Sequence, residues 1–159
     1  MPPFPHRTQN PPIYTYICTE QLVTFKNNYI YHTSGRSPKV SGNTVLHAVN
    51  NYWHDNSGHA FEIDAGGMVV AEGNVFQNIN APVESGYKGQ LFSSPSTGAN
   101  AVCESHLGHV CETNGFGSSG SFEGSDSSFL SNFDGKNVAT AEPYSVAKNV
   151  QSSAGFGKI

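Results

Sequence analysis

The chain has 159 residues, the usual size of one domain. Charged residues make up 13% and hydrophobic residues 36%, so both classes fall below the globular averages of about 25% and about 45–50%. The 17 glycines and 9 prolines argue against a helical bundle, while the 11% of aromatic residues argues against a disordered chain. A net charge of −4 disfavours a nucleic-acid-binding surface, and no apolar run reaches the roughly 18 residues of a membrane span. The composition is typical of a turn-rich β protein.

Residues 1–21 share neither the composition nor the periodicity of the sequence that follows, and we expect them to form an irregular N-terminal segment. The prolines after Met1 interrupt any apolar run, so this segment lacks the apolar region of a signal peptide. It contains Cys18, which is the odd one of three cysteines, because Cys103 and Cys111 could close a short loop between them.

A repeat of about 23 residues occupies residues 22–94. Its three units have an asparagine at the same position, and three columns of apolar residues recur in register around it. The asparagines are Asn28, Asn51 and Asn74, and the columns are Val23/Leu46/Val69, Phe25/Ala48/Ala71 and Ile30/Trp53/Phe76. Within each unit apolar and polar residues alternate, which is the period of a β-strand.

Short strands that recur at this interval, separated by Asn, Gly and Ser, predict an all-β fold, a parallel β-helix of about three coils. Stacked coils lie about 4.8 Å apart. We therefore expect the equivalent asparagines to hydrogen-bond along the stack, and the apolar columns to form the core. The coil that begins near Leu22 has no convincing neighbour below it, so we expect either that its strand edge promotes self-association or that residues 1–20 serve as an improvised cap.

The sequence after the repeat is less regular. Residues 95–126 are rich in Gly and Ser and are expected to lack regular structure. Residues 142–150 are predicted to form a short helix with Pro143 in its first turn, followed by a tail.

Three further patterns are weak signals of function. Residues 115–120 match the dinucleotide-binding pattern GxGxxG, but they neither follow a clear strand nor open a helix. Glu62 and Asp64 lie on one face of a predicted strand, which is either the carboxylate pair of a glycoside hydrolase or simply a solvated face. Two histidine pairs lack a third ligand at a zinc-binding spacing: His54 with His59, and His106 with His109.

Residues 22–40, Leu-Val-Thr-Phe-Lys-Asn-Asn-Tyr-Ile-Tyr-His-Thr-Ser-Gly-Arg-Ser-Pro-Lys-Val, resemble the core of fungal pectin lyases. The resemblance continues through residues 47–53, 57–63, 71–78, 114–120 and 133–137. It covers residues 22–159 as the C-terminal part of a longer domain, and residues 1–21 resemble no part of it. The resemblance implies a right-handed parallel β-helix with coils over residues 22–94 and C-terminal loops and a tail over residues 95–159.

The resemblance also implies an activity, the β-elimination of methyl-esterified polygalacturonate in plant cell-wall pectin. Arg36, in Gly-Arg-Ser-Pro-Lys, matches the family's catalytic arginine, which removes the C5 proton before the C4–O4 bond breaks. A guanidinium has a pKa above about 12, so a basic role needs desolvation and nearby cations. Lys39 is expected to bind substrate, either as such a cation or by stabilising the enolate-like charge on the carboxyl group.

Further expectations follow from the resemblance. A disulfide joins Cys103 to Cys111, and Cys18 has no equivalent. No metal or other cofactor is expected, because the methyl ester removes the charge that calcium would neutralise. The partner is pectin, with neither nucleic acid nor membrane, and the location is extracellular. The full-length family is expected to be monomeric, whereas this shorter chain, as an incomplete part of such an enzyme, could self-associate.

Two alternatives are a non-catalytic carbohydrate-binding or structural β-helix, and a glycoside hydrolase of similar shape. The first is open because much of the family's cleft belongs to sequence upstream of the matched part. The 23-residue period makes a further prediction about the site. It places Arg36 beside His59 and Lys39 beside Glu62 in neighbouring coils, so that a Lys39–Glu62 ion pair would keep Lys39 protonated.

Overall fold

The computed structural model describes residues 21–158. The expected irregular segment lies outside the described residues except for Gln21, which belongs to the first strand, and Cys18 lies outside them as well.

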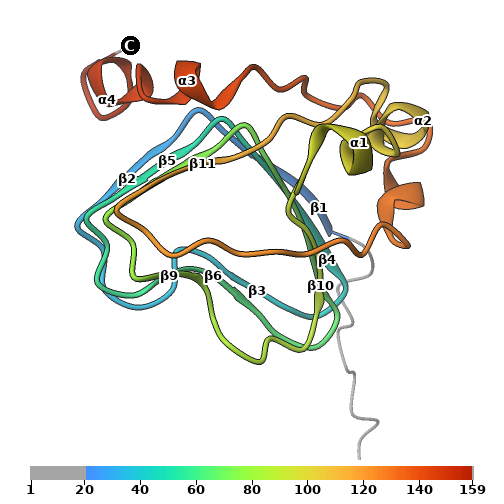
Figure 1. The fold of residues 1–159 in the computed structure, drawn as a ribbon, viewed down its shortest axis with the longest axis horizontal. Coiled ribbons are helices and arrows are strands. Elements are labelled where there is room, and N and C mark those ends of the chain that lie inside the picture. Colours follow the sequence, from blue (N-terminus) through green and yellow to red (C-terminus); the bar gives the residue numbers. More distant parts are fainter. Residues whose placement is uncertain (1–20, 159) are drawn as a thin grey trace, which may run out of the picture.

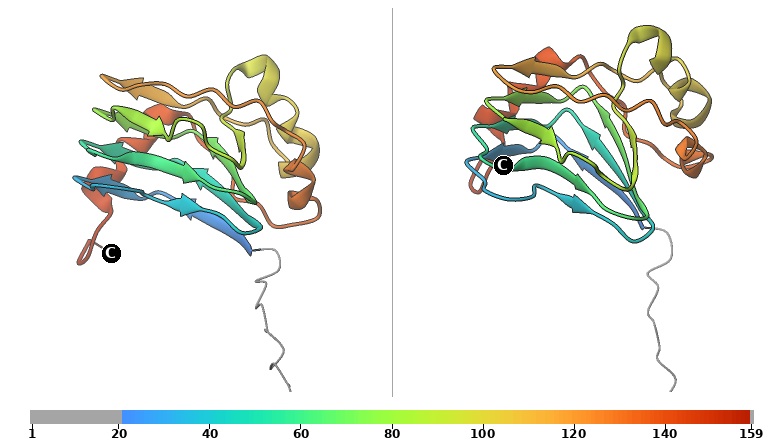
Figure 2. Two further views of the ribbon diagram at one scale, coloured as in Figure 1. Left: turned by 90° about the horizontal axis from the view of Figure 1, so that it is seen from below. Right: turned by 60° about the horizontal axis from the view of Figure 1, so that its bottom comes forward.

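The described chain winds through three parallel sheets that enclose a roughly triangular core (Figure 1). The first sheet contains β1 (Gln21–Lys26), β4 (Thr44–Val49), β7 (Gly67–Glu72) and β10 (Gln90–Phe92). The second sheet contains β2 (Tyr29–Tyr31), β5 (Tyr52–His54), β8 (Val75–Gln77) and β11 (Gly115–Gly117). The third sheet contains β3 (Lys39–Val40), β6 (His59–Ile63) and β9 (Ala81–Val83). Each full coil gives one strand to each sheet, and the coils stack on one another (Figure 2). The predicted parallel β-helix is confirmed.

The predicted register is confirmed at each of the three apolar columns. Val23 pairs with Leu46 and Leu46 with Val69, and the other two columns pair in the same way. In the second and third coils these residues are almost fully buried, and they form one continuous interior core with Phe61. Burial of such columns supplies most of the favourable free energy of a solenoid.

The asparagine ladder is present and longer than predicted. Asn28 donates from its backbone and its side chain to Asn51 Oδ1 at 2.9 and 3.0 Å, and Asn51 donates in the same way to Asn74 Oδ1. Asn74 then donates to Asn114 Oδ1 at 2.9 Å. Asn114 escaped the sequence pattern because an insertion lengthens the interval from 23 to 40 residues.

The expectation that residues 95–126 are irregular holds for most of this segment but not for all of it. A fourth, incomplete coil continues the stack through β10 and β11, and the insertion between them carries α1 (Thr97–Asn100) and α2 (Cys103–Leu107). These helices have four and five residues, too few to show a helical period in the sequence.

The predicted helix over residues 142–150 is divided in two. Helix α3 (Tyr144–Ala147) follows Pro143, and α4 (Val150–Ser153) takes up residues expected to belong to the tail. Hydrogen bonds to the third preceding residue join them, as in Asn149 to Val146 and Ser152 to Asn149. Such tight turns do not extend into long helices.

The helices cover two of the three sheets. The outer face of the first sheet packs against α2 and the 3₁₀ helix η1 (Leu130–Phe133). The outer face of the second sheet packs against Ala147 and Val150 of α3 and α4. Figure 1 shows all of these helices on the side away from β3, β6 and β9, so within residues 21–158 the third sheet has no helical cover. None of the described helices has the length and apolar character needed to cross a membrane.

Candidate functional site

The segment that carries Arg36 and Lys39 is fixed by hydrogen bonds to the next coil. The Ser37 amide donates to the Ala60 carbonyl at 3.2 Å, and the Ser37 hydroxyl donates to the His59 carbonyl at 3.1 Å. The Trp53 indole donates from inside the core to the Ser37 carbonyl at 2.7 Å. The backbone beneath the candidate site is therefore preorganised by the β-helix.

A column of glycines lets the two coils approach closely beside Arg36. A Cβ atom added to Gly58 would lie 2.0 Å from the Gly35 carbonyl oxygen, and Gly35 has φ +92°. A side chain at Gly58 would collide with the Gly35 backbone, and a side chain at Gly35 would be strained by the positive φ. The recurrence of glycine at these two positions thus reflects the geometry that presents Arg36.

Arg36, Lys39, Glu62 and Asp64 form a charged cluster on the third sheet. Arg36 pairs through Nε with Glu62 Oε2, and Lys39 Nζ lies 2.9 Å from Glu62 Oε1 and 3.3 Å from Asp64 Oδ2. The predicted register is confirmed, because Arg36 bridges to His59 and Lys39 pairs with Glu62. The predicted Lys39–Glu62 ion pair is confirmed as well.

The cluster is anchored at its acidic end. The Glu62 side chain is 10% exposed, whereas the Arg36 side chain is 59% exposed and the Lys39 side chain 40%. The contact between Arg36 and Glu62 was missed in the sequence, although the 23-residue period already placed Glu62 next to Lys39. Glu62 is thus not the solvated carboxylate of the simpler interpretation.

The cluster keeps both of its cations charged. Glu62 raises the pKa of Arg36 through the hydrogen bond at Nε, and Glu62 followed by Asp64 raises the pKa of Lys39. Lys39 and then Arg36 lower the pKa of Glu62, while the Ala65 amide and then Lys39 lower the pKa of Asp64. This environment is the opposite of the cationic one expected for a neutral arginine base.

The pKa directions also bear on the glycoside hydrolase alternative. A glycosidase needs one carboxyl group with a raised pKa to act as general acid. Both Glu62 and Asp64 have lowered pKa values and both contact the same ammonium group, Lys39 Nζ. Neither is suited to that role.

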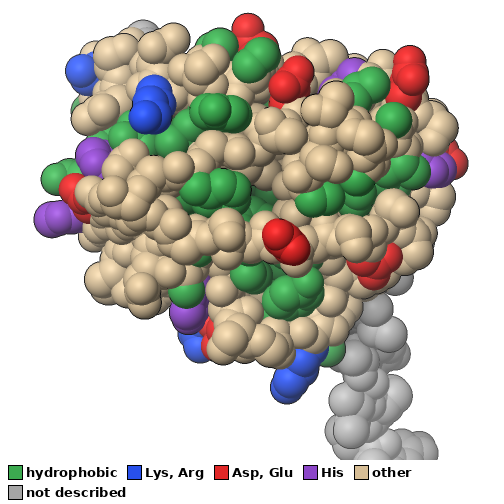
Figure 3. Space-filling model, in the orientation of Figure 1, with side chains coloured by type: hydrophobic (Ala, Val, Ile, Leu, Met, Phe, Trp, Pro, Cys, Tyr) green, Lys and Arg blue, Asp and Glu red, His purple; other side chains and the backbone are tan. Residues whose placement is uncertain are grey.

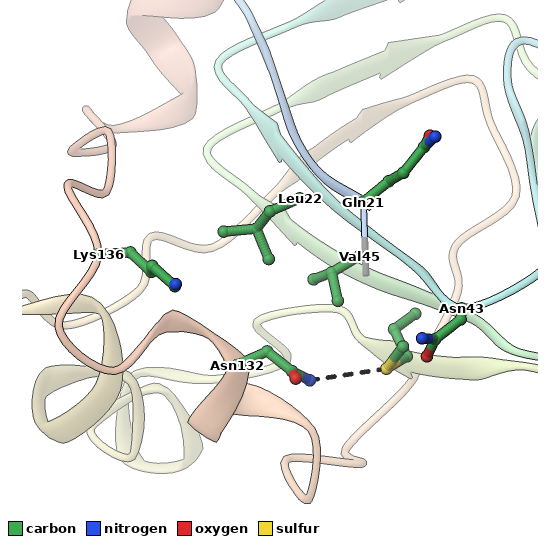
Figure 4. Close-up of a pocket in the computed structure, with 7 residues that line it drawn as sticks. Gln21, Leu22, Asn43, Val45, Asn132 and Lys136 are labelled. Atoms are coloured by element: carbon green, nitrogen blue, oxygen red, sulfur yellow. Dashed lines mark hydrogen bonds between the residues drawn. The ribbon is translucent and has the colours of Figure 1, made fainter. Parts of the chain in front are cut away.

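A pocket opens directly beside the charged cluster. It is lined by Glu62, Ile63, Asp64, Glu84, Ser85, Gly86, Tyr87 and Lys88. Hydroxyl, carboxylate, ammonium and aromatic groups of this kind suit a hydrated sugar chain better than an apolar ligand. A different pocket lies between η1 and the start of the first sheet, where Asn132 points toward Met68 (Figure 4). Arg36 and Lys39 do not line this second pocket.

The histidine pairs and the glycine pattern, which are weak signals of function in the sequence, make structural contacts. The two histidines of each pair face different groups: His54 contacts Tyr29, His59 the Ala81 carbonyl, His106 Asp134, and His109 Glu72. Within residues 21–158, no group of three or more His, Cys, Asp or Glu side chains is placed to hold a metal ion. The glycine pattern at residues 115–120 begins with β11, where a Cβ on Gly115 would lie 2.4 Å from the Tyr144 ring. These glycines therefore serve packing.

Another polar cluster, centred on the buried Glu72, was not predicted from the sequence. The fully buried Glu72 accepts hydrogen bonds from His47 Nε2 at 2.6 Å, from His109 Nε2 at 3.0 Å and from the Glu112 amide at 3.1 Å. His47 belongs to β4, while His109 and Glu112 belong to the insertion after β10. Glu72 thus ties the insertion to the outer face of the first sheet.

The predicted disulfide between Cys103 and Cys111 is confirmed. It closes the same insertion at its base, and both cysteines pack with Leu107 and η1 against the first sheet.

On the face drawn in Figure 3, the Lys and Arg side chains are scattered and form no continuous basic patch.

Comparisons with known proteins agree with this structure. The sequence profile of the family described as "Pectate lyase" matches residues 18–159. "Probable pectin lyase A" of Neosartorya fischeri is 66% identical over 142 residues, which are 89% of this chain and 38% of that protein. "Pectin lyase B" of Emericella nidulans is 62% identical over the same shares. "Pectin lyase A" of Emericella nidulans is 65% identical over 86% of this chain and 36% of that protein.

The chain therefore spans a little over one third of the length of the curated relatives it matches, in their C-terminal part. The parallel β-helix, the charged cluster on its third sheet and the profile match over most of the sequence lead to one conclusion. The chain belongs to the pectate lyase family.

Proposed function

We propose that this chain forms the C-terminal part of a pectin lyase and carries its catalytic arginine, Arg36. The observation that supports this most is the exposed Arg36 guanidinium beside Lys39 on the third sheet, in a chain 62–66% identical to proteins named pectin lyase. The proposed substrate is methyl-esterified polygalacturonate, and the proposed cleavage is eliminative.

The proposed reaction proceeds in two bond-breaking steps. A base takes the C5 proton, which the ester carbonyl acidifies, and the electron pair moves onto the carboxyl group. The C4–O4 bond then breaks, a C4–C5 double bond forms, and the departing O4 takes up a proton. Lys39, which Glu62 and Asp64 keep protonated, is suited to stabilise the charge on the carboxyl group.

We propose that Arg36 is the base that removes the C5 proton. It must lose a proton before it can accept one, and Glu62 opposes that loss. The rate of elimination is therefore expected to rise toward alkaline pH, as the neutral fraction of Arg36 grows.

Replacement of Arg36 by lysine is expected to reduce kcat by about 10²- to 10⁴-fold. Lysine keeps the positive charge but lacks the planar guanidinium fork, so the exchange is not conservative at this site. The measurement is the ultraviolet absorbance of unsaturated product formed from highly methylated pectin. Lys136→Ala is the matched control, because Lys136 lines the pocket near η1 and not the charged cluster.

The same assay separates the non-catalytic alternative. A folded wild-type chain that binds pectin but yields no unsaturated product would support a carbohydrate-binding β-helix instead. Unchanged activity in Arg36→Lys would contradict the catalytic role of Arg36 but not the proposed lyase activity.

We propose an extracellular location for the protein, with pectin as its partner. The Cys103–Cys111 disulfide supports this, because such bonds persist in oxidising compartments.

We also propose that the isolated chain self-associates through its first coil. Among residues 21–158, β1 pairs on one edge only, with β4, and Leu22 and Val23 are 44% and 41% exposed. Unpaired strand edges next to apolar side chains promote association. Sedimentation velocity is expected to show species larger than a monomer, increasing with protein concentration. A single monomeric boundary across the concentration range would contradict this proposal.

A further inference from the structure

We propose that Glu62 is a positioning residue for Arg36. Its carboxylate, presented by the neighbouring coil, holds the inner edge of the guanidinium and directs the terminal Nη nitrogens outward to substrate. This role rests on the proposed function of Arg36.

The geometry of the contact supports this role. A guanidinium has five N–H donors in a fixed plane, so a bond at Nε sets the direction of the other four. Glu62 Oε2 accepts from Arg36 Nε, and within residues 21–158 no side-chain or backbone acceptor bonds to the Nη atoms. The remaining donors of Arg36 are therefore available to a bound sugar chain.

Glu62 is itself held firmly. Its backbone amide donates to the Pro38 carbonyl at 3.1 Å, in the segment that carries Arg36. Its other carboxylate oxygen contacts Lys39 Nζ at 2.9 Å, and the side chain is only 10% exposed. One nearly buried carboxylate thus fixes both cations of the site relative to each other.

The other two carboxylates near the site do not have this geometry. Asp64 contacts Lys39 but not Arg36, and its side chain is 41% exposed. Glu84 lines the adjacent pocket and acts on Arg36 through its charge alone, without a hydrogen bond. They provide matched controls for the removal of one negative charge.

The first test is the protection of the Arg36 Nε–H proton from exchange with solvent, measured by NMR in this chain. A hydrogen bond to a charged acceptor is expected to slow exchange by roughly tenfold or more relative to a free arginine. Glu62→Gln should weaken that protection, because the glutamine amide is neutral and has one acceptor oxygen where the carboxylate offers one to Arg36 and one to Lys39. Glu84→Gln should preserve it. The same loss is expected in the wild-type chain when low pH protonates Glu62, which tests the contact without a substitution.

The second test is activity. Glu62→Gln is expected to lower kcat on the order of 100-fold with little change in KM, the signature of a misplaced catalytic group. It should also move the alkaline rise of the rate to lower pH, because the pKa of Arg36 falls when the carboxylate is removed. Glu104→Gln, which removes one negative charge from α2, should do neither.

The two proposals fail in different ways. An unprotected Nε–H in the folded wild-type chain, or protection and kcat that Glu62→Gln leaves unchanged, would overturn the role of Glu62. If instead the wild-type chain forms no unsaturated product while Nε–H is protected only in the presence of Glu62, the proposed function fails and the positioning of Arg36 stands.

Discussion

Glu72→Gln is expected to lower the free energy of unfolding by about 3–5 kcal/mol, the usual cost of removing one partner of a buried ion pair. Glu72 is fully buried and is the common acceptor for His47, His109 and the Glu112 amide. A glutamine of the same shape would place an NH₂ group against N–H donors. Urea denaturation at constant pH measures the change.

The contribution of the Glu72 cluster to stability is expected to decrease at both low pH and high pH. Burial alone would raise the pKa of Glu72, but hydrogen bonds from His109 and His47 outweigh it and leave the pKa lowered. The pKa of His109 is raised, first by its hydrogen bond to Glu72. A carboxyl group with a lowered pKa stabilises the fold at pH values above its pKa in the unfolded chain, and this stabilisation is lost as the pH falls. A histidine with a raised pKa stabilises the fold at pH values below its pKa in the unfolded chain, and this stabilisation is lost as the pH rises.

The cluster should therefore stabilise the protein most between about pH 4.5 and about pH 6.5, where Glu72 is ionised and His109 is protonated. The Nδ1 atoms of His47 and His109 are both buried and have no hydrogen-bond partner among the described residues. The ring of His47 also packs edge-on against Phe133 of η1. A stability maximum in this range for the wild-type chain, flattened in Glu72→Gln, is the expected result.

His106→Gln serves as the control for the Glu72 prediction. His106 pairs with Asp134 in the same region of the chain, but at the surface, where ion pairs contribute little. It should leave the stability and its pH maximum nearly unchanged. Equal losses in His106→Gln and Glu72→Gln would show that burial of the Glu72 cluster is not the cause.

Asn51→Ala is expected to lower the free energy of unfolding by about 3 kcal/mol, because it leaves two backbone groups without partners in or near the core. The Asn51 side chain donates to the Phe25 carbonyl at 2.7 Å and accepts from the Asn28 amide at 2.9 Å. It is fully buried, so water cannot replace these bonds without entering the core. Thermal or urea unfolding, followed by circular dichroism, measures the loss.

Asn28→Ala provides the matched control at the end of the same ladder. Asn28 is only partly buried, and its side chain donates to Asn51 and to the Lys26 carbonyl, which are near the open end of the stack. Its replacement should cost about 1 kcal/mol. If the inner and end rungs cost the same, the ladder does not stabilise the coils through burial of its hydrogen bonds.

The interval of 23 residues was sufficient to predict much of this fold. Because stacked coils are in register, a position in one coil predicts its neighbour in the next, and Lys39 beside Glu62 followed from counting alone. The same count failed at Asn114, where the insertion changes the interval although the hydrogen bond is the same as at Asn74. Periodicity is therefore informative only while the coil length stays constant.

The repeating architecture of this protein follows from its amino-acid pattern: the strands, the apolar columns, the asparagine ladder and the pairing of neighbouring coils. These depend on contacts at a fixed distance along the chain. Only the folded structure shows which sheet has no helical cover within residues 21–158, that Glu62 turns toward Arg36 as well as Lys39, and that Glu72 contacts both His47 and His109. Each of these depends on how side chains orient, or on how an insertion without a repeat folds back onto the coils, and no interval in the sequence encodes that.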